Sequence, residues 1–164
     1  MPTAAKKPTV PNITDGANAP ACSLTLSGGK SADLASFKGK KNVVLYFYPK
    51  DDTPGCTTEA KDFASLAKQF EKADTVIIGI SKDDLKSHDT FRTKYELPFA
   101  LASDDSGIAE SFGVWGEKNM YGKKYMGIVR STFLIDKSGK IAKSWPKVSV
   151  TGHAADVLKA AQSL

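Results

Sequence analysis

One segment constrains the fold more than any other, because a strongly apolar run is followed closely by the start of a helix. Residues 42–48 have the character of a buried strand. Pro49 ends this strand, since proline has no N–H to donate to a sheet ladder. Thr53 suits the N-cap of a helix and Pro54 its first position. The segment therefore predicts a strand, a loop and a helix in succession, as in an α/β protein.

The same segment carries Cys56 into the first turn of the predicted helix, where backbone N–H groups have no intrahelical partner. A free thiol has a pKa of about 8.5, and only the thiolate is a nucleophile. A helix N-terminus stabilises a negative charge by at most about 2 kcal/mol. Lowering a thiol pKa to about 6 requires roughly 3.4 kcal/mol. A reactive Cys56 would therefore need a nearby cation, for which a distant arginine is best suited. The residues alone leave open that Cys56 is an ordinary helix-start cysteine.

Length and composition exclude several classes of protein. The 164 residues correspond to one domain that can bury a core without disulfides. Two cysteines are too few for a disulfide-stabilised secreted scaffold. The 23 basic and 18 acidic residues give a net charge of +5, and they are intermixed without the interleaved aromatic residues of a nucleic-acid platform. No apolar run approaches the roughly 18 residues of a membrane span. We therefore expect neither a nucleic-acid nor a membrane partner.

The beginning of the chain differs in composition from the rest. Residues 1–18 are rich in Pro, Thr, Ala and Lys and predict a flexible N-terminal arm, with the folded domain at residues 19–164. Residues 1–10 lack the apolar segment of a secretory signal. We therefore expect a cytoplasmic protein, with an organellar or nuclear address left open.

Beyond the first strand, strands and helices alternate. Apolar residues recur at helical spacing from Ala60 to Phe70, so the helix begun at Pro54 is predicted to reach about Glu71. Strands are predicted at 22–26, 75–80, 99–102, 131–136 and 141–145, helical segments at 34–37, 81–96, 103–112 and 151–164, and a loop at 114–127. This order predicts a thioredoxin-like α/β fold, a central mixed sheet with helices on both faces.

Aromatic and histidine residues add weaker indications. The large side chains of the predicted loop at 114–127 would either cover the core or rim the entrance to an active site. His88 and His153, taken with the two cysteines, lack metal-ligand spacing, so no metal site is expected. His153 is expected to pack at the start of the last helix.

A family resemblance rests on the residues around Cys56. The pattern Pro49-x-x-x-Thr53-x-x-Cys56 resembles the active-site signature of peroxiredoxins. The longer run at residues 47–59 is similar in particular to the bacterioferritin-comigratory-protein, or PrxQ, branch. The resemblance covers about residues 19–164. Ala19, Pro20 and Leu24 resemble the family's first strand, residues 127–136 resemble its arginine-bearing strand, and residues 152–154 resemble the start of its last helix.

The resemblance implies an antioxidant enzyme, a thiol-dependent peroxidase that reduces hydrogen peroxide and alkyl hydroperoxides without metal or organic cofactor. It implies that Cys56 is oxidised to a sulfenic acid by the peroxide. The implied site comprises the catalytic residues Cys56, Thr53, Arg130 and Pro49, supported by Glu59 and Gly55. From the residues alone, Arg130 would be a surface or salt-bridge residue. Glu59 would equally support a helix turn.

The chain departs from the family pattern at the resolving cysteine. Many members of this branch carry a resolving cysteine either five residues after the peroxidatic cysteine or in the following helix. This chain has Lys61 at the first of these places and Phe91 and Arg92 at the second. The usual intrachain disulfide is therefore not expected. Cys22 is expected to be a buried structural thiol, with a resolving role as the alternative. We expect a 1-Cys enzyme recycled by thioredoxin, glutaredoxin or glutathione.

Two other functions are alternatives to peroxidase activity. A peroxide-sensing redox relay or a holdase would use the same Cys56 without many turnovers. A dithiol reductase is untenable because the sequence contains no Cys-x-x-Cys. We expect the protein to be a monomer, with a weak dimer as the alternative.

Overall fold

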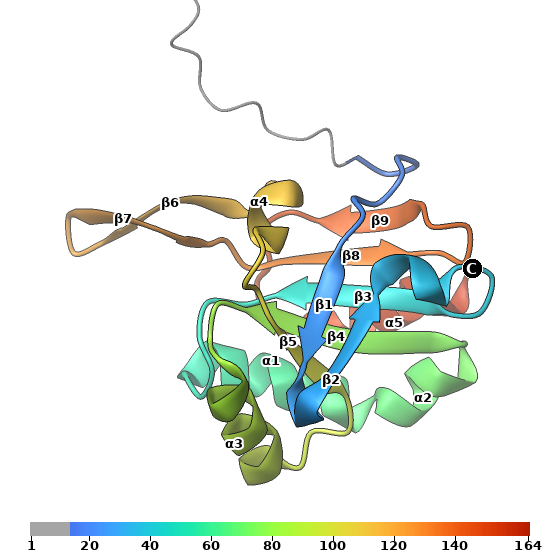
Figure 1. Ribbon diagram of the computed structural model, residues 1–164, viewed down its shortest axis with the longest axis horizontal. Coiled ribbons are helices and arrows are strands. Elements are labelled where there is room, and N and C mark those ends of the chain that lie inside the picture. Colours follow the sequence, from blue (N-terminus) through green and yellow to red (C-terminus); the bar gives the residue numbers. More distant parts are fainter. Residues whose placement is uncertain (1–13) are drawn as a thin grey trace, which may run out of the picture.

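A mixed seven-stranded sheet forms the centre of the computed structural model, which describes residues 14–164 (Figure 1). Across the sheet the strands are ordered β2-β1-β5-β4-β3-β8-β9. Strands β3, β4 and β5 run parallel, whereas β1, β8 and β9 pair antiparallel with their neighbours. The strands are β1 (Ser23–Leu26), β2 (Lys30–Asp33), β3 (Asn42–Phe47), β4 (Thr75–Ser81), β5 (Ala100–Ser103), β8 (Ser131–Ile135) and β9 (Ile141–Trp145).

Helices cover the two faces of this sheet unequally. One face carries α1 (Pro54–Ser65), α2 (Ala67–Lys72), α3 (Leu85–Tyr95) and α5 (His153–Gln162). The other face carries α4 (Ile108–Ser111) and the short 3-10 turn η2 (Leu34–Phe37), and a second such turn, η1 (Ser27–Gly29), joins β1 to β2. The predicted α/β fold with helices on both faces is confirmed. No helix in the described part of the chain has the length and apolar character needed to cross a membrane.

Strand β3 explains why two apolar cores form. Its six residues are all buried, and successive side chains of a strand point to opposite faces. Val43, Leu45 and Phe47 therefore join the core beneath α4. Val44 and Tyr46 join the core beneath α1, α2, α3 and α5. A strand buried on both faces explains the continuous apolar run in the sequence.

The prediction of the helical region after Cys56 is only partly right. The helix expected from Pro54 to about Glu71 is interrupted at Leu66, whose φ and ψ of −105° and 3° are not helical. Two helices, α1 and α2, result. The apolar spacing continues through the break, because both helices bury residues in the same core, namely Phe63 and Phe70. Periodicity alone therefore did not reveal the interruption.

The prediction of a loop at residues 114–127 is wrong. They contain most of an antiparallel hairpin of β6 (Trp115–Met120) and β7 (Lys123–Ile128), separate from the main sheet and projecting from the body of the molecule (Figure 1). Tyr121 and Gly122 form the turn with positive φ angles of 53° and 79°. The two strands are mostly exposed and polar, so they lack the apolar alternation that predicts a strand. Strand β2 was missed for the same reason.

The start of the described chain lies against the edge of the sheet. The amide of Gly16 donates to the carbonyl oxygen of Ile141 at 2.7 Å, and Asn18 forms an isolated bridge with Lys140. These contacts attach residues 14–18 to β9. The rest of the predicted arm, residues 1–13, lies outside the described residues.

Candidate active site

The loop after β3 delivers Cys56 to the third position of α1. Thr53 occupies the N-cap with extended φ and ψ of −95° and 157°, and Pro54 is the first helical residue. The amide of Thr57 donates to the carbonyl oxygen of Thr53 at 2.8 Å, which closes the first turn. The backbone N–H groups of Gly55 and Cys56 therefore lie at the open, positive end of the helix.

The Thr53 side chain differs from the expected helix cap. Its hydroxyl donates to the carbonyl oxygen of Lys50 at 2.9 Å and makes no capping bond to the helix. A hydroxyl carries one proton and two lone pairs, so donation to Lys50 leaves the oxygen free to accept. Thr53 therefore presents an acceptor beside the first turn of α1.

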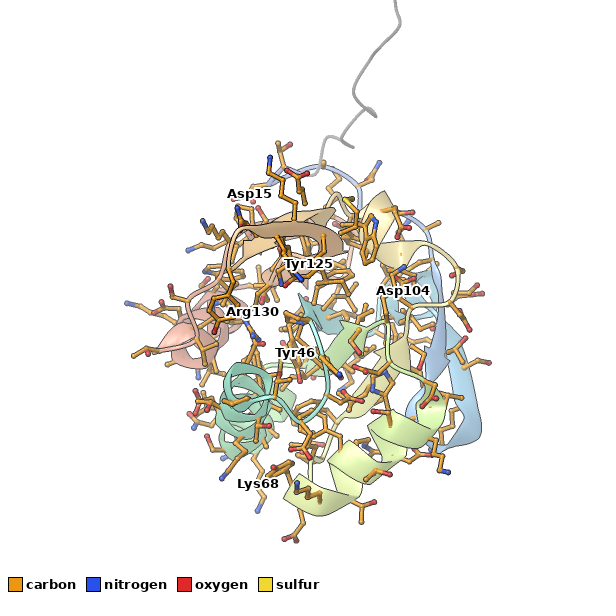
Figure 2. All side chains as sticks on the ribbon, turned by 90° about the vertical axis from the view of Figure 1, so that its left-hand side faces the viewer. Asp15, Tyr46, Lys68, Asp104, Tyr125 and Arg130 are labelled. Carbon is orange, nitrogen blue, oxygen red and sulfur yellow. The ribbon has the colours of Figure 1, made fainter. Side chains whose placement is uncertain are left out.

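Arg130 reaches back to the start of α1 from the short connection between β7 and β8 (Figure 2). Its Nη2 donates to Sγ of Cys56 at 3.4 Å, and its Nη1 donates to Oε1 of Glu59 at 2.6 Å. The structure thus brings together three residues that the resemblance grouped. The cation required beside Cys56 is present, 74 residues away along the chain.

Gly55 makes room for this arginine. A Cβ atom built on Gly55 would lie 3.1 Å from Nη2 of Arg130, closer than an ordinary van der Waals contact. The guanidinium group therefore packs directly over the backbone of the first turn. This close approach gives Gly55 a steric role in addition to its backbone N–H.

Glu59 and Arg130 form a largely buried ion pair. Glu59 is 1% exposed, and burial raises the pKa of its carboxyl to about 7, although Arg130 acts in the opposite direction. Burial would lower the pKa of Arg130, but Glu59 and Cys56 outweigh it and raise that pKa, so the arginine stays charged. A lone carboxylate would oppose ionisation of a neighbouring thiol. Here its charge is compensated by the same arginine that contacts the sulfur.

Sequence reasoning missed a second cation near the site, Lys118 on β6. Its Nζ donates to the carbonyl oxygen of Ile128 at 3.0 Å. Burial lowers the pKa of Lys118 and Arg130 lowers it further, whereas Cys56 raises it, which places Lys118 within electrostatic reach of both. No signal in the sequence could identify it, because its position depends on the unpredicted hairpin.

The other hairpin side chains answer the question left open for residues 114–127. Tyr121 is 98% exposed, and Tyr125 and Met126 are also exposed, so these three do not cover the core. Trp115 is partly buried against the core beneath α4. Tyr125 lies on the hairpin that carries Lys118, on the side of the molecule that also presents Arg130 (Figure 2).

The two cysteines lie on opposite faces of the sheet. Cys56 is 1% exposed and belongs to the core beneath α1, α2, α3 and α5, and Pro49 lies partly buried in the loop before it. Cys22 packs against the core on the other face. It is partly exposed, although it was expected to be buried. Burial and then Asp104 and Asp33 raise the pKa of Cys22 to about 11. Cys22 therefore stays protonated at neutral pH.

The two histidines occupy separate buried sites. His153 is the first residue of α5, as expected, and its Nε2 lies 2.7 Å from the hydroxyl oxygen of Thr132. His88 lies on α3 and is completely buried. Among residues 14–164, no three His, Cys, Asp or Glu side chains are grouped in a way that could hold a metal ion.

Comparisons with known proteins agree with this geometry. Residues 16–144 match the AhpC/TSA family. Peroxiredoxin Bcp of Bacillus subtilis is 50% identical over 148 residues, which are 90% of this chain and 94% of that protein. The structure of peroxiredoxin Q from Xanthomonas campestris superposes with a TM-score of 0.82 at 48% identity, covering 87% of this chain and 90% of that one.

A mutant of PrxQ from Xylella fastidiosa superposes with a TM-score of 0.85 at 40% identity, covering 95% of this chain and 98% of that one. The thioredoxin-like fold predicted from the order of elements is thereby confirmed. The chain belongs to the AhpC/TSA family and, within it, to the Bcp/PrxQ peroxiredoxins, which are thiol-dependent peroxidases.

Proposed function

We propose that this peroxiredoxin reduces hydrogen peroxide and alkyl hydroperoxides at Cys56 and that it is a 1-Cys enzyme recycled by an external thiol. The observation that carries the proposal is the contact of Arg130 Nη2 with Cys56 Sγ, 3.4 Å long, at the open end of α1. One solved relative, the bacterioferritin comigratory protein of Xanthomonas campestris, is described by its alkyl peroxide reduction activity.

The chemical step moves negative charge from sulfur to oxygen. The Cys56 thiolate attacks one oxygen of the hydroperoxide in line with the O–O bond, which breaks. Sulfur is oxidised to the sulfenic acid, which keeps the attacked oxygen and its proton, and the other oxygen leaves as an alkoxide or hydroxide that takes a proton from water. Arg130 and the first-turn N–H groups stabilise charge at both ends of this transfer.

The remaining residues of the site orient the peroxide. The Thr53 hydroxyl donates to Lys50, so its oxygen accepts the O–H of the hydroperoxide and directs that oxygen toward the sulfur. Gly55 lets the guanidinium lie over the first turn. Glu59 fixes the arginine through its 2.6 Å hydrogen bond. Pro49 shields the thiol from water at the end of β3.

Recycling requires a thiol from outside the chain. The two positions of the family's resolving cysteine carry Lys61 and, on α3, Arg92, whose Nη1 contacts the hydroxyl of Ser27 at 3.4 Å. Cys22 is separated from Cys56 by the sheet, whereas a disulfide needs Cα atoms within about 7 Å. An external thiol therefore displaces water from the sulfenic acid to form a mixed disulfide, and a second thiol releases Cys56.

The reductant, compartment and assembly follow from the same proposal. Thioredoxin, glutaredoxin and glutathione all supply the required thiol. A cytoplasmic location fits two cysteines that are both unpaired. We propose a monomer as the active form, with a weak dimer as the alternative.

Replacement of Cys56 tests the function directly. Cys56→Ser should abolish peroxide consumption with excess dithiothreitol and leave the fold intact, because serine is nearly isosteric and far less nucleophilic. Stopped-flow peroxide decay and circular dichroism measure the two effects, and Cys22→Ser is the matched control that should turn over like the parent. Residual activity above about a tenth of the parent rate would contradict the assignment. Consumption of a single equivalent by the parent would favour the sensor function instead.

A further inference from the structure

A buried polar cluster lies behind the loop that precedes Cys56, and its centre is the carboxylate of Asp51. Oδ1 of Asp51 accepts from the hydroxyl of Tyr48 at 2.5 Å. Oδ2 accepts from the hydroxyl of Ser87 at 2.8 Å and lies 2.8 Å from Nδ1 of His88. Burial, followed by Tyr46 and Asp51, raises the pKa of Tyr48, so this hydroxyl keeps its proton and donates. Two hydroxyl donors and a histidine ring nitrogen therefore converge on one buried carboxylate.

The surroundings of His88 show that its Nε2 atom carries a hydrogen. The side chain is 0% exposed, and its Nε2 lies 3.0 Å from the carbonyl oxygen of Ala102 on β5. A backbone carbonyl only accepts, so Nε2 carries a hydrogen. The hydroxyls of Tyr48 and Ser87 donate to the carboxylate of Asp51, whose Oδ2 also lies 2.8 Å from Nδ1 of His88. His88 and Asp51 thus form a buried hydrogen-bonded pair that joins the loop to α3 and β5.

This pair and Asp83 together hold one peptide group of the active-site loop. The amide N–H of Asp51 donates to Oδ2 of Asp83 at 2.8 Å. The carbonyl oxygen of the same peptide group belongs to Lys50 and accepts from the Thr53 hydroxyl at 2.9 Å. Because a peptide group is planar and rigid, holding Asp51 also holds the carbonyl that orients Thr53. The cluster is therefore connected to the peroxide by two hydrogen bonds, one from the Thr53 hydroxyl to the Lys50 carbonyl oxygen and one from the hydroperoxide to the Thr53 oxygen.

Asp52, the next residue of the loop, has a backbone conformation that is unfavourable for a residue other than glycine. Asp52 has a left-handed φ of 58°, a conformation that costs free energy outside glycine. Its carboxylate accepts from Lys94 at 2.7 Å and from the Tyr95 hydroxyl at 2.6 Å, both at the end of α3. These contacts are exposed to water and individually weak. The buried contacts of Asp51 supply the firmer attachment of the loop to α3.

We propose that Asp51 and His88 are positioning residues for peroxide reduction, holding the Lys50–Asp51 peptide group so that the Thr53 oxygen is aimed at the peroxide beside Cys56. The inference rests on the proposed role of Thr53 and Cys56. Neither Asp51 nor His88 is hydrogen-bonded to the sulfur. The pair therefore acts on the orientation of the peroxide and leaves the ionisation of the thiol unchanged.

The test compares two reactions of Cys56 in the full-length protein, each in a single turnover without reductant. Oxidation by hydrogen peroxide requires the Thr53 oxygen, whereas alkylation by iodoacetamide reports only the thiolate. Asp51→Ala and His88→Leu should slow oxidation by about tenfold or more, as misplacement of a reacting group does, and change alkylation by less than about twofold. If both reactions slow equally, or if neither slows, the positioning role is overturned.

Two further variants separate geometry from charge and from stability. Asp51→Asn can donate its amide to a neutral His88 and accept from Tyr48, so it should oxidise within about threefold of the parent. A rate as low as that of Asp51→Ala would overturn the proposal. Asp104→Ala is the matched control, because Asp104 is also a buried carboxylate but accepts from the amides of Ile108 and Ala109 on the other face. It should destabilise the fold and change neither rate.

One milder variant keeps the proposal falsifiable if the larger changes prevent folding. Tyr48→Phe removes only one donor to Asp51 and should slow oxidation by about twofold to fivefold without changing alkylation. An unchanged oxidation rate in Tyr48→Phe would overturn the proposal. Rapid oxidation of the parent at Cys56 is required throughout, and its absence would contradict the proposed function itself.

Discussion

At the scale of single residues, the first turn of α1 shows how a missing side chain supports catalysis. Gly55 faces the guanidinium of Arg130, which is anchored on its other side by Glu59. The arginine therefore has little freedom to retreat from a new methyl group. If a side chain at Gly55 pushed the guanidinium away, the 3.4 Å contact between Arg130 Nη2 and Cys56 Sγ would lengthen.

Gly55→Ala should accordingly separate stability from activity. Alanine favours helix over glycine by up to about 1 kcal/mol, so the free energy of unfolding should rise or stay equal. The Cβ atom would press on Arg130 from 3.1 Å, so oxidation of Cys56 by peroxide should slow by about threefold to thirtyfold. Urea unfolding and stopped-flow oxidation measure the two quantities. An unchanged oxidation rate would show that the arginine is not constrained at Gly55.

At the scale of elements, α5 is joined to the sheet by a neutral histidine. His153 begins the helix directly after Gly152, and its ring lies edge-on to Phe63 and Trp145. Its Nε2 lies 2.7 Å from the Thr132 hydroxyl on β8. Burial, with a smaller contribution from Arg130, lowers the pKa of His153 to about 4, although Asp156 opposes the shift.

The docking of α5 should therefore depend on acid. The unfolded chain binds a proton at this histidine near pH 6.5, whereas the folded chain binds it only near pH 4. As the pH falls between these values, the unfolded state holds more protons, so the free energy of unfolding decreases, by roughly 1–3 kcal/mol. Urea unfolding at pH 7 and pH 4.5 should show this decrease. In His153→Leu the free energy of unfolding should differ less between the two pH values than it does in the parent. An equal difference in the variant and the parent would show that His153 is not the origin of the effect.

At the scale of the whole molecule, the sheet separates the two thiols. Cys56 lies beneath α1, α2, α3 and α5, and Cys22 lies on the face covered by α4. Strands β5 and β4 also lie between β1 and β3 in the sheet order. A bond between the two sulfurs would require the fold to open.

Intact-mass spectrometry after one equivalent of peroxide should therefore show a gain of one oxygen on Cys56. Excess peroxide should add further oxygens, because no second thiol of the chain removes the sulfenic acid. Cys22→Ser should give the same masses. Loss of two hydrogens mapped to a link between Cys22 and Cys56 would make Cys22 the resolving thiol. A disulfide-linked dimer would indicate recycling between subunits.

Local sequence signals were enough to predict the strand, loop and helix that carry Cys56. Their signals are local, because apolar residues, Pro49 and the Thr53-Pro54 pair act within about one turn of the residues they affect. The expected capping role of the Thr53 side chain is wrong, since its hydroxyl donates to the Lys50 carbonyl and its oxygen accepts no hydrogen bond from the helix backbone. Residues 114–127 were misjudged because an exposed hairpin has no apolar period.

The groups that surround the thiol come from distant parts of the chain and are brought together by folding. The antiparallel register that sets Phe47 opposite Ser131 places Arg130 at the end of β3, next to the loop that leads to Cys56. Packing of α3 against the sheet likewise brings His88 to Asp51, 37 residues away. Such pairings depend on the closure of long loops and on shared burial, and no local pattern encodes them. The thiol is therefore placed by local sequence, and the groups around it are placed by the fold.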